Sequence, residues 1–349
     1  MADRVLEYLG ELGLEANEDD AGARIGSTMG NVLCRLEPRA DGGTGLFFCA
    51  HLDTVPPEGP IEPAVDEDGV VRNNGGTILG ADDKSAVASI LEATARLVED
   101  GRPHGGVELL STPKEEVGLL GAAAFDERRL AARVGYVYDH AGPIGEVILG
   151  APYHQKLDVH FRGRAAHAGM YPEEGRSAVA AAARAIADLR LGRIDDETSA
   201  NVGRIEGGTA RNVVPDHCWF AAEARSHDER KLAELAQEML DTVTFAASLS
   251  ECEVEMQVGP AARGYRFRRD APAVDLAAAA LTRVGREPRF ILAGGGADAN
   301  VFNERGLQCV NLANGMTDIH TPDERIAVAD LEQMVDVTLA LVDEASRRA

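Results

Sequence analysis

Phe47-Phe48-Cys49-Ala50-His51-Leu52-Asp53-Thr54 is the stretch around which the rest of the chain is organised. Residues 46–50 form a short apolar run, which predicts a buried strand ending at His51. Side chains alternate along a strand, so Asp53 lies on the same side as His51 if the extended geometry continues. A metal-bound imidazole usually donates its second N–H to a carboxylate. This His-x-Asp therefore suits a metal ligand and its orienting group, although an isolated one is more simply a polar loop with a turn-forming Asp.

Two further apolar strands are predicted downstream, and each runs into acidic residues. Residues 107–111 lead to Glu115 and Glu116, and residues 134–138 lead to Asp139. Apolar residues at helical spacing predict helices between the strands, at residues 85–98 and 121–130. This order is typical of a mostly parallel sheet, in which functional side chains gather at the carboxyl ends of the strands.

The pattern changes near Gly150. Alternating strands and two long helices then follow in the order β-α-β-β-α-β, which is the split ferredoxin-like unit. Beyond Gly259-Pro260 the α/β pattern resumes. We therefore expect a mostly parallel α/β/α domain built from residues 1–150 and 261–349, with a ferredoxin-like α+β domain inserted at residues 151–260.

Length and charge narrow the class of protein. A chain of 349 residues is long for one core, which also favours two domains. The 35 Lys and Arg residues against 58 Asp and Glu residues give a net charge of −23, which disfavours nucleic acid and anionic membranes as partners. The excess of negative charge would help to attract cations, although adaptation of the host to salt would explain this excess equally well.

The cysteines indicate a reducing compartment. The five cysteines include no Cys-x-x-Cys pair, and several lie in apolar runs, so we expect reduced, buried thiols. The first residues lack the features of a secretory signal, and no apolar run reaches membrane-spanning length. We expect a soluble cytoplasmic protein.

Histidines and carboxylates after strands suit a two-metal hydrolytic site. Zinc accepts imidazole and carboxylate, and two ions about 3.5–4 Å apart can share a carboxylate and a water. Of Glu115 and Glu116, one would bind metal while the other takes a proton from the water, although two solvated glutamates are the simpler explanation of the pair alone. Asp82 and Asp83 stand at the start of a predicted helix, where capping explains one of them but not both.

Taken together, these segments resemble the aminoacylase/carboxypeptidase-G family of dizinc exopeptidases, and most of all its peptidase T (tripeptide aminopeptidase) branch. The resemblance covers nearly the whole chain, and the motifs are specific as a set rather than singly. They are His51-Leu52-Asp53-Thr54, Gly80-Ala81-Asp82-Asp83-Lys84, Thr112-Pro113-Lys114-Glu115-Glu116-Val117-Gly118, Asp139, Gly295-Gly296-Ala297-Asp298-Ala299 and His320.

The resemblance implies a role for each matching residue. His51 and Asp139 would bind one divalent ion, Glu116 and His320 the other, and Asp82 would bridge them. The ions would be zinc, with cobalt or manganese as substitutes in vitro. Asp53 would orient His51, Glu115 would be the general base, and the Asp82–Asp83 peptide bond would be cis.

The resemblance also extends to the inserted domain, which in relatives is a lid or dimerisation domain. His167 would help to stabilise the oxyanion, and Arg211 and Asn212 would contact the substrate, as would Gly295 in the larger domain. His167 and Arg211 would otherwise be ordinary loop residues. An exposed edge strand of the lid would pair with its copy in a homodimer.

The expected function is zinc-dependent hydrolysis of an amide bond in short peptides, as an aminopeptidase or tripeptidase. The alternatives are a carboxypeptidase or an N-acyl amino acid amidohydrolase of the same family, and a non-catalytic binding protein on the same fold. A non-catalytic binding protein would be expected to lack some of the metal-ligand residues, and all of these residues are present.

Overall fold

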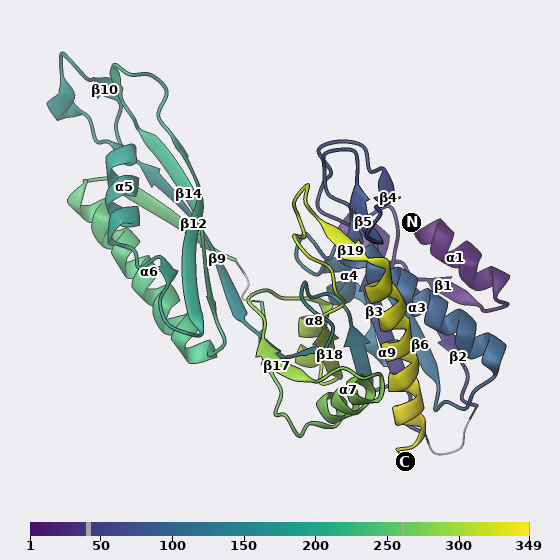
Figure 1. Ribbon diagram of the computed structural model, residues 1–349. Helices are drawn as coiled ribbons and strands as arrows, with labels where there is room; N and C mark the ends of the chain where they lie inside the picture. The colour runs from purple at the N-terminus through teal and green to yellow at the C-terminus, as the bar shows by residue number, and fades with distance from the viewer. Residues whose placement is uncertain (40–42, 260–261, 349) are drawn as a thin grey trace. The chain divides into compact units, whose positions relative to one another are not determined.

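The computed structural model describes residues 1–39, 43–259 and 262–348 (Figure 1). The chain forms two compact units. The first unit consists of Met1–Ala151 and Arg266–Ala349, and the second of Pro152–Tyr265. The second unit is therefore inserted into the sequence of the first.

The first unit is built on one large sheet. Its strands follow the order β1 (Ala16–Glu18), β2 (Val32–Leu36), β6 (Val107–Thr112), β3 (Leu46–His51), β7 (Val134–Val137), β18 (Gln308–Leu312), β8 (Glu146–Ala151) and β16 (Tyr265–Arg266), with β17 (Arg289–Leu292) also paired to β8. The central strands β6, β3, β7 and β18 are parallel. β1 and β2 continue the sheet in antiparallel fashion, and β8 is antiparallel to β18.

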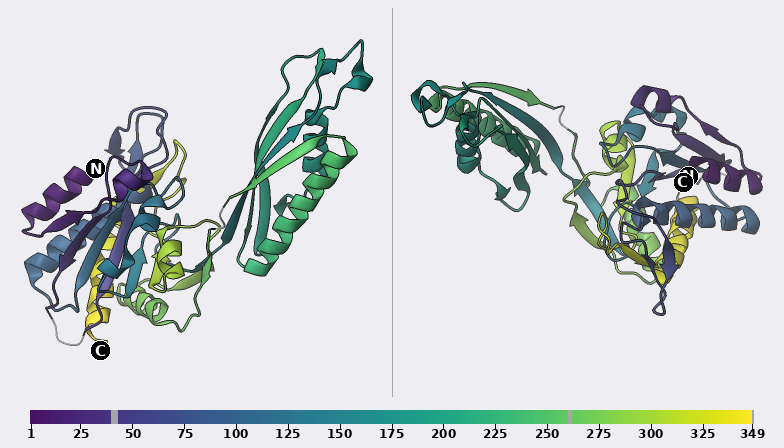
Figure 2. Two further views of the ribbon diagram at one scale, coloured as in Figure 1. Left: turned by 180° about the vertical axis from the view of Figure 1, so that it is seen from behind. Right: turned by 90° about the horizontal axis from the view of Figure 1, so that it is seen from above.

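Helices cover both faces of this sheet (Figures 1 and 2). All six residues of β3 are buried, as expected for a central parallel strand. Phe48 packs in the core shared by α1 (Ala2–Glu11), α3 (Ala81–Asp100), α7 (Pro272–Arg283) and α9 (Val328–Ser346). Its neighbour Phe47 meets Phe302 of α8 (Asp298–Glu304) on the opposite face, with ring centroids 5.3 Å apart. Two short helices, α2 (Ala21–Ile25) and α4 (Leu120–Ala124), also belong to the first unit.

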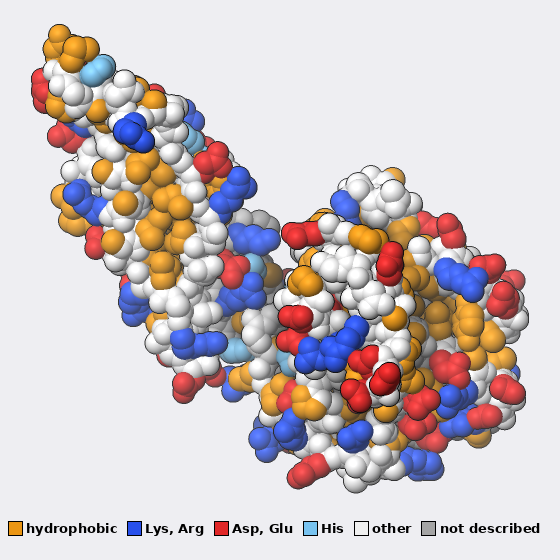
Figure 3. Space-filling view, turned by 45° about the horizontal axis from the view of Figure 1, so that its top comes forward, with side chains coloured by type: hydrophobic (Ala, Val, Ile, Leu, Met, Phe, Trp, Pro, Cys, Tyr) orange, Lys and Arg blue, Asp and Glu red, His pale blue; other side chains and the backbone are white. Residues whose placement is uncertain are grey.

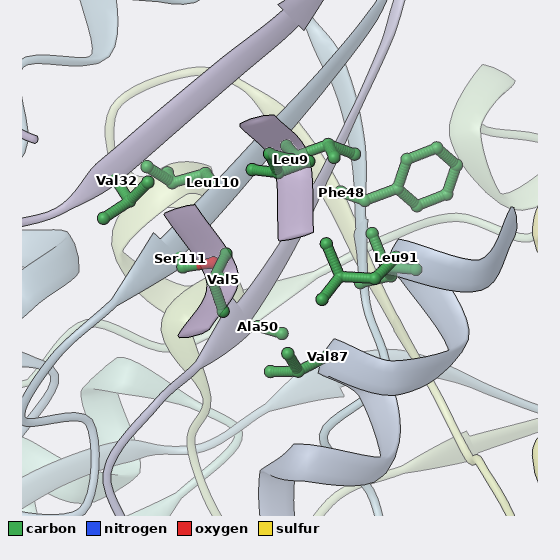
Figure 4. Close-up of a pocket in the computed structure, with 11 residues that line it drawn as sticks. Val5, Leu9, Val32, Phe48, Ala50, Val87, Leu91, Leu110 and Ser111 are labelled. Carbon is green, nitrogen blue, oxygen red and sulfur yellow. The ribbon is translucent and has the colours of Figure 1, made fainter. Parts of the chain in front are cut away.

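A small apolar cavity lies where α1 crosses the sheet. Figure 4 shows Val5 and Leu9 of α1 above Ala50 and Phe48 of β3, with Val87 of α3 beside them. The lining is almost entirely hydrophobic, so the cavity is a packing gap in the core.

A separate three-stranded sheet carries the segment that contains His320. It consists of β4 (Pro63–Val65), β5 (Val70–Asn73) and β19 (Arg325–Ala327), in the order β19-β5-β4. β4 and β5 form a hairpin, and β19 joins it from a distant part of the sequence.

The second unit has the predicted split topology. Its sheet runs β11 (Gly192–Arg193), β12 (Thr198–Gly207), β14 (His217–Ser226), β9 (Tyr153–Arg162) and β15 (Glu253–Val258), and all its pairings are antiparallel. α5 (Ala178–Asp188) and α6 (Glu229–Leu249) share its hydrophobic core. The short strands β10 (Ala166–His167) and β13 (Val213–Val214) pair beyond this sheet. The fold class predicted from the sequence is therefore confirmed.

Three local expectations need correction. The helix expected at residues 121–130 ends at Ala124, because Phe125 is extended and buried and the Asp126 carboxylate caps the 3-10 turn Glu127–Arg129. The cap of α3 is Gly80, with φ of 76°, so neither aspartate caps this helix. The cysteines are unpaired as expected, but Cys252 is only partly buried.

No helix in the described ranges is both long and apolar enough to cross a bilayer.

Candidate metal centre

The polar residues singled out in the first unit converge at one edge of the sheet. His51 ends β3, Glu115 and Glu116 follow β6, and Asp139 lies just beyond β7. Asp82 stands at the start of α3, and His320 lies in the segment after β18. Because the central strands are parallel, their carboxyl ends bring these loops together.

The donor atoms form two groups that share Asp82. His51, Asp82 and Asp139 make one group, and Asp82, Glu116 and His320 make the other, with the ligand atoms of each group within 4.8 Å of one another. Glu115 and Glu116 also lie within this distance of His51. The sharing of Asp82 is the arrangement expected for two ions bridged by one carboxylate.

The distances support this grouping. His51 Nε2 lies 3.1 Å from Asp82 Oδ1, and His320 Nε2 lies 3.1 Å from Asp82 Oδ2. His320 Nε2 is also 3.0 Å from Glu116 Oε1. Two donors that each lie about 2.0–2.1 Å from one zinc ion are themselves about 3 Å apart. Each oxygen of Asp82 thus faces a different histidine.

Burial and charge also favour a cation. Burial raises the pKa of Glu115 to about 9, and the nearby Asp298 carboxylate adds to this effect. Burial likewise raises the pKa of Asp139, whereas hydrogen bonds with His320 and His51 outweigh burial and lower the pKa of Asp82. Gathering buried carboxylates is costly unless cations neutralise them. Imidazole and carboxylate are ordinary ligands of divalent ions, so this donor set fits them.

The carboxylate of Asp53 lies closer to the backbone N–H groups of Glu115 and Glu116 than to the imidazole of His51. Its carboxylate accepts hydrogen bonds from the backbone N–H groups of Glu115 and Glu116, at 3.0 and 3.2 Å. His51 Nδ1 lies 3.2 Å from the Asp53 carbonyl oxygen and 3.6 Å from Oδ1 of its carboxylate. Backbone and side chain of Asp53 therefore both face the imidazole.

The Asp82–Asp83 peptide bond is cis, as the family resemblance implies. Asp83 is fully buried, and one of its carboxylate oxygens accepts the backbone N–H of His51 at 3.3 Å.

Sequence reasoning missed two buried carboxylates that support the centre. Glu324 accepts three backbone N–H groups just before and at Asp82. Asp298 accepts the hydroxyl of Thr112, the last residue of β6. Asp298 belonged to a quoted motif without an assigned role, and a lone glutamate after His320 gave no signal.

Of the other candidate residues, one belongs to the first unit and three belong to the second. Gly295 is exposed in the segment between β17 and α8. His167, Arg211 and Asn212 belong to the second unit, where pairing of β10 with β13 brings their segments together. The Asn212 carbonyl accepts the N–H of Ala168 at 3.0 Å. The exposed His167 ring accepts the N–H groups of two residues that follow it, which fixes the ring locally.

Comparison with known families identifies the chain. The model of "Peptidase family M20/M25/M40" matches residues 47–344. The chain belongs to this peptidase family. The match spans both units, and it confirms the resemblance drawn from the motifs.

Several relatives are peptidases by name. The crystal structure of aminopeptidase PepT from Bacillus cereus is 40% identical, with a TM-score of 0.90 over 99% of this chain and 92% of that one. A tripeptidase from Staphylococcus aureus is 32% identical, with a TM-score of 0.95 over the same shares. The Bacillus subtilis protein YqjE is 38% identical over 97% of this chain and 90% of its own length. Peptidase T of Escherichia fergusonii is 27% identical over 78% of this chain and 67% of its own length.

Proposed function

We propose that this chain is a zinc-dependent aminopeptidase that cleaves short peptides such as tripeptides. The observation that carries the proposal is the position of Asp82, whose two carboxylate oxygens face two different histidines at 3.1 Å. In this assignment His51 and Asp139 hold one ion, Glu116 and His320 hold the other, and Asp82 holds both.

The residues around the ions would divide the chemistry between them. When bound, a pair of zinc ions lowers the pKa of a water and polarises the scissile carbonyl. Glu115 takes the proton from the attacking water and returns it to the leaving amine, so it acts first as base and then as acid. Asp53 holds the backbone of Glu115 and Glu116, which keeps the proton acceptor and the ligand in their separate places.

The remaining assignments concern the oxyanion and the peptide substrate. We assign His167 to the carbonyl oxygen as it gains charge, and Arg211 and Asn212 to contacts with the peptide. Gly295, in the first unit, is assigned to the substrate as well; its Cβ position has no neighbouring atom within 4 Å, so close approach of a ligand is unhindered. These roles rest on the family resemblance.

The choice of an aminopeptidase over other family activities rests on the relatives. The two solved structures named above are an aminopeptidase and a tripeptidase. Carboxypeptidase and N-acyl amino acid amidohydrolase activities are the alternatives. A non-catalytic binding protein is less well supported, because the ligand residues and Glu115 occur together in one cluster.

A substrate panel tests the proposal. The panel contains di- and tripeptides, the same tripeptides acetylated at the amino end, N-acyl amino acids and folyl-glutamate analogues, each with zinc, cobalt or manganese. Free tripeptides should be cleaved at the first bond, and acetylation should abolish cleavage. A chelator should remove activity, and zinc should restore it. Cleavage of the acylated compounds alone would instead identify an amidohydrolase.

A further inference from the structure

Glu324 is a buried carboxylate with an unusual set of partners. Only 1% of its surface is exposed. Its Oε2 accepts the N–H groups of Leu79 and Gly80, both at 2.8 Å, and its Oε1 accepts the N–H of Asp82 at 3.0 Å. Hydrogen bonds to an ionised group are stronger than those between neutral groups. One side chain therefore fixes the backbone that leads into the shared ligand Asp82.

The backbone that Glu324 holds departs from regular helical geometry around Gly80 and Asp82. Gly80 adopts a left-handed conformation with φ of 76°, and α3 has no side-chain cap at its start. The N–H groups at the start of a helix have no partners within that helix. Glu324 supplies a partner for one of them, the N–H of Asp82, and for the N–H groups of Leu79 and Gly80 just before the helix, from a segment more than 240 residues away in the sequence.

The other end of the link is the segment that presents His320. Thr317 and Arg325 exchange backbone hydrogen bonds at 3.0 and 3.1 Å, which closes the segment into a loop. His320 lies within it with φ of 63°, a left-handed conformation that is uncommon outside glycine. Glu324 stands at the base of the same loop, next to Arg325. A single carboxylate thus ties the loop of His320 to the backbone of Asp82.

We propose that Glu324 is a positioning residue that sets the spacing between Asp82 and His320 and thereby the affinity for the ion they share. The inference rests on the proposed metal site. The two histidine-facing oxygens of Asp82 are fixed by the backbone that Glu324 holds, and the imidazole of His320 is carried by the loop to which Glu324 belongs. Loss of the link lets the two ligands move independently.

The test is titration of the metal-free protein with zinc or cobalt alone, followed by calorimetry and by the visible absorption of bound cobalt. Glu324→Gln keeps the size of the side chain but turns an NH₂ group toward backbone donors. Substitutions that disturb the partners of metal ligands typically lower metal affinity by about 10–100-fold. We expect a loss of this size for one of the two ions, together with a changed cobalt spectrum.

Glu108→Gln is the matched control. Glu108 is also buried, at 4% exposed, and it also accepts a backbone N–H, from Ala132, besides pairing with Arg35. It stands at the opposite end of β6 from Thr112. Its variant should lower the melting temperature of the metal-free protein and leave both metal affinities unchanged.

The outcomes separate the inference from the proposed function. If the wild type binds no metal, the proposed function and the inference both fail. If the wild type binds two ions and Glu324→Gln binds them with unchanged affinity, only the inference is wrong. If Glu324→Gln does not fold, Glu324→Asp is measured instead. The shorter side chain of Asp cannot reach all three N–H donors, so this variant should also lower the affinity for the ion shared by Asp82 and His320.

Discussion

Glu115 and Glu116 are neighbours in the sequence with very different surroundings. Glu115 is buried, whereas Glu116 is partly exposed and lies 3.0 Å from the imidazole of His320. Lys114 precedes them with φ of 57°, so the chain turns sharply before the pair. This turn and the Asp53 carboxylate give each glutamate its own direction.

The pair yields a prediction for two isosteric variants. Glu115→Gln cannot accept a proton, so it should keep both metals while turnover falls on the order of 10²–10⁴-fold. Glu116→Gln should instead lose affinity for one metal, and added zinc should restore part of the activity. Metal content and turnover of both variants, measured side by side, check this. If Glu115→Gln loses metal while Glu116→Gln keeps both ions, the two roles are reversed.

At the scale of single residues, the sequence predicts the side chains that would bind metal or transfer a proton. It predicts less well the side chains that hold these groups in place. His51, Glu115 and Asp139 lie at the end of apolar strands or shortly after them, which marked them as candidates, and the family resemblance supplied their roles. Glu324 contacts backbone groups more than 240 residues away, and no local pattern records such a contact. The supporting carboxylates could therefore be identified only from the fold.

α1 packs against the core of the first unit through a few apolar side chains. Val5 and Leu9 are the large buried side chains of this helix, at 3% and 1% exposed, and both line the small cavity. The surrounding packing is already incomplete there, so removal of a side chain would enlarge an existing gap (Figure 4).

Leu9→Ala should therefore destabilise the protein by about 2–5 kcal/mol. Urea unfolding measures the free energy, and Glu7→Ala, an exposed position on the same helix, is the control and should change it little. Because α1 carries none of the proposed ligands, turnover well below the melting temperature should match that of the wild type. A loss no larger than that of Glu7→Ala would show that α1 adds little to the stability of the first unit.

Element prediction succeeded where apolar spacing was regular. α3 (Ala81–Asp100) contains the helix expected at residues 85–98 and extends it by a few residues at each end. The length of the helix after Glu116 was overestimated, because the sequence of residues 121–130 is compatible with a helix throughout, although Phe125 leaves the helix and packs in the core. The three-residue strands β1 and β19 are too short to show alternation, and only their partners define them.

For the whole molecule, the second unit offers a surface for assembly. Among the described residues, β11 pairs with β12 only at Ser199 and Ala200, so residues 201–207 have an open outer edge. Hydrophobic side chains also form a band on the face of this unit seen in Figure 3. The large exposed ones of the unit are Met170, Tyr171, Leu191, Ile205, Phe245, Leu249 and Val258. Open edges favour pairing with another strand.

We predict a homodimer through the outer edge of β12. Light scattering at micromolar concentration should give twice the 37.0 kDa mass of the chain. Ile205→Lys places a charge on this edge and should yield monomers. Val258→Lys, at an equally exposed position on the opposite edge strand β15, is the control and should stay dimeric. A wild type that scatters as a monomer contradicts the prediction, and dissociation by Val258→Lys alone would move the interface to β15.

The interrupted order of the first unit has a consequence for the nascent chain. β18, which lies between β7 and β8, is translated only after the whole second unit. Residues 152–265 are contiguous, so they can complete their fold on the ribosome while the large sheet still has a gap. Domains generally fold as units during synthesis. Since β18 and His320 follow the second unit in the sequence, the cluster around Asp82 is complete only after that unit has been made, and a chain that stops before β18 lacks one of the proposed ligands.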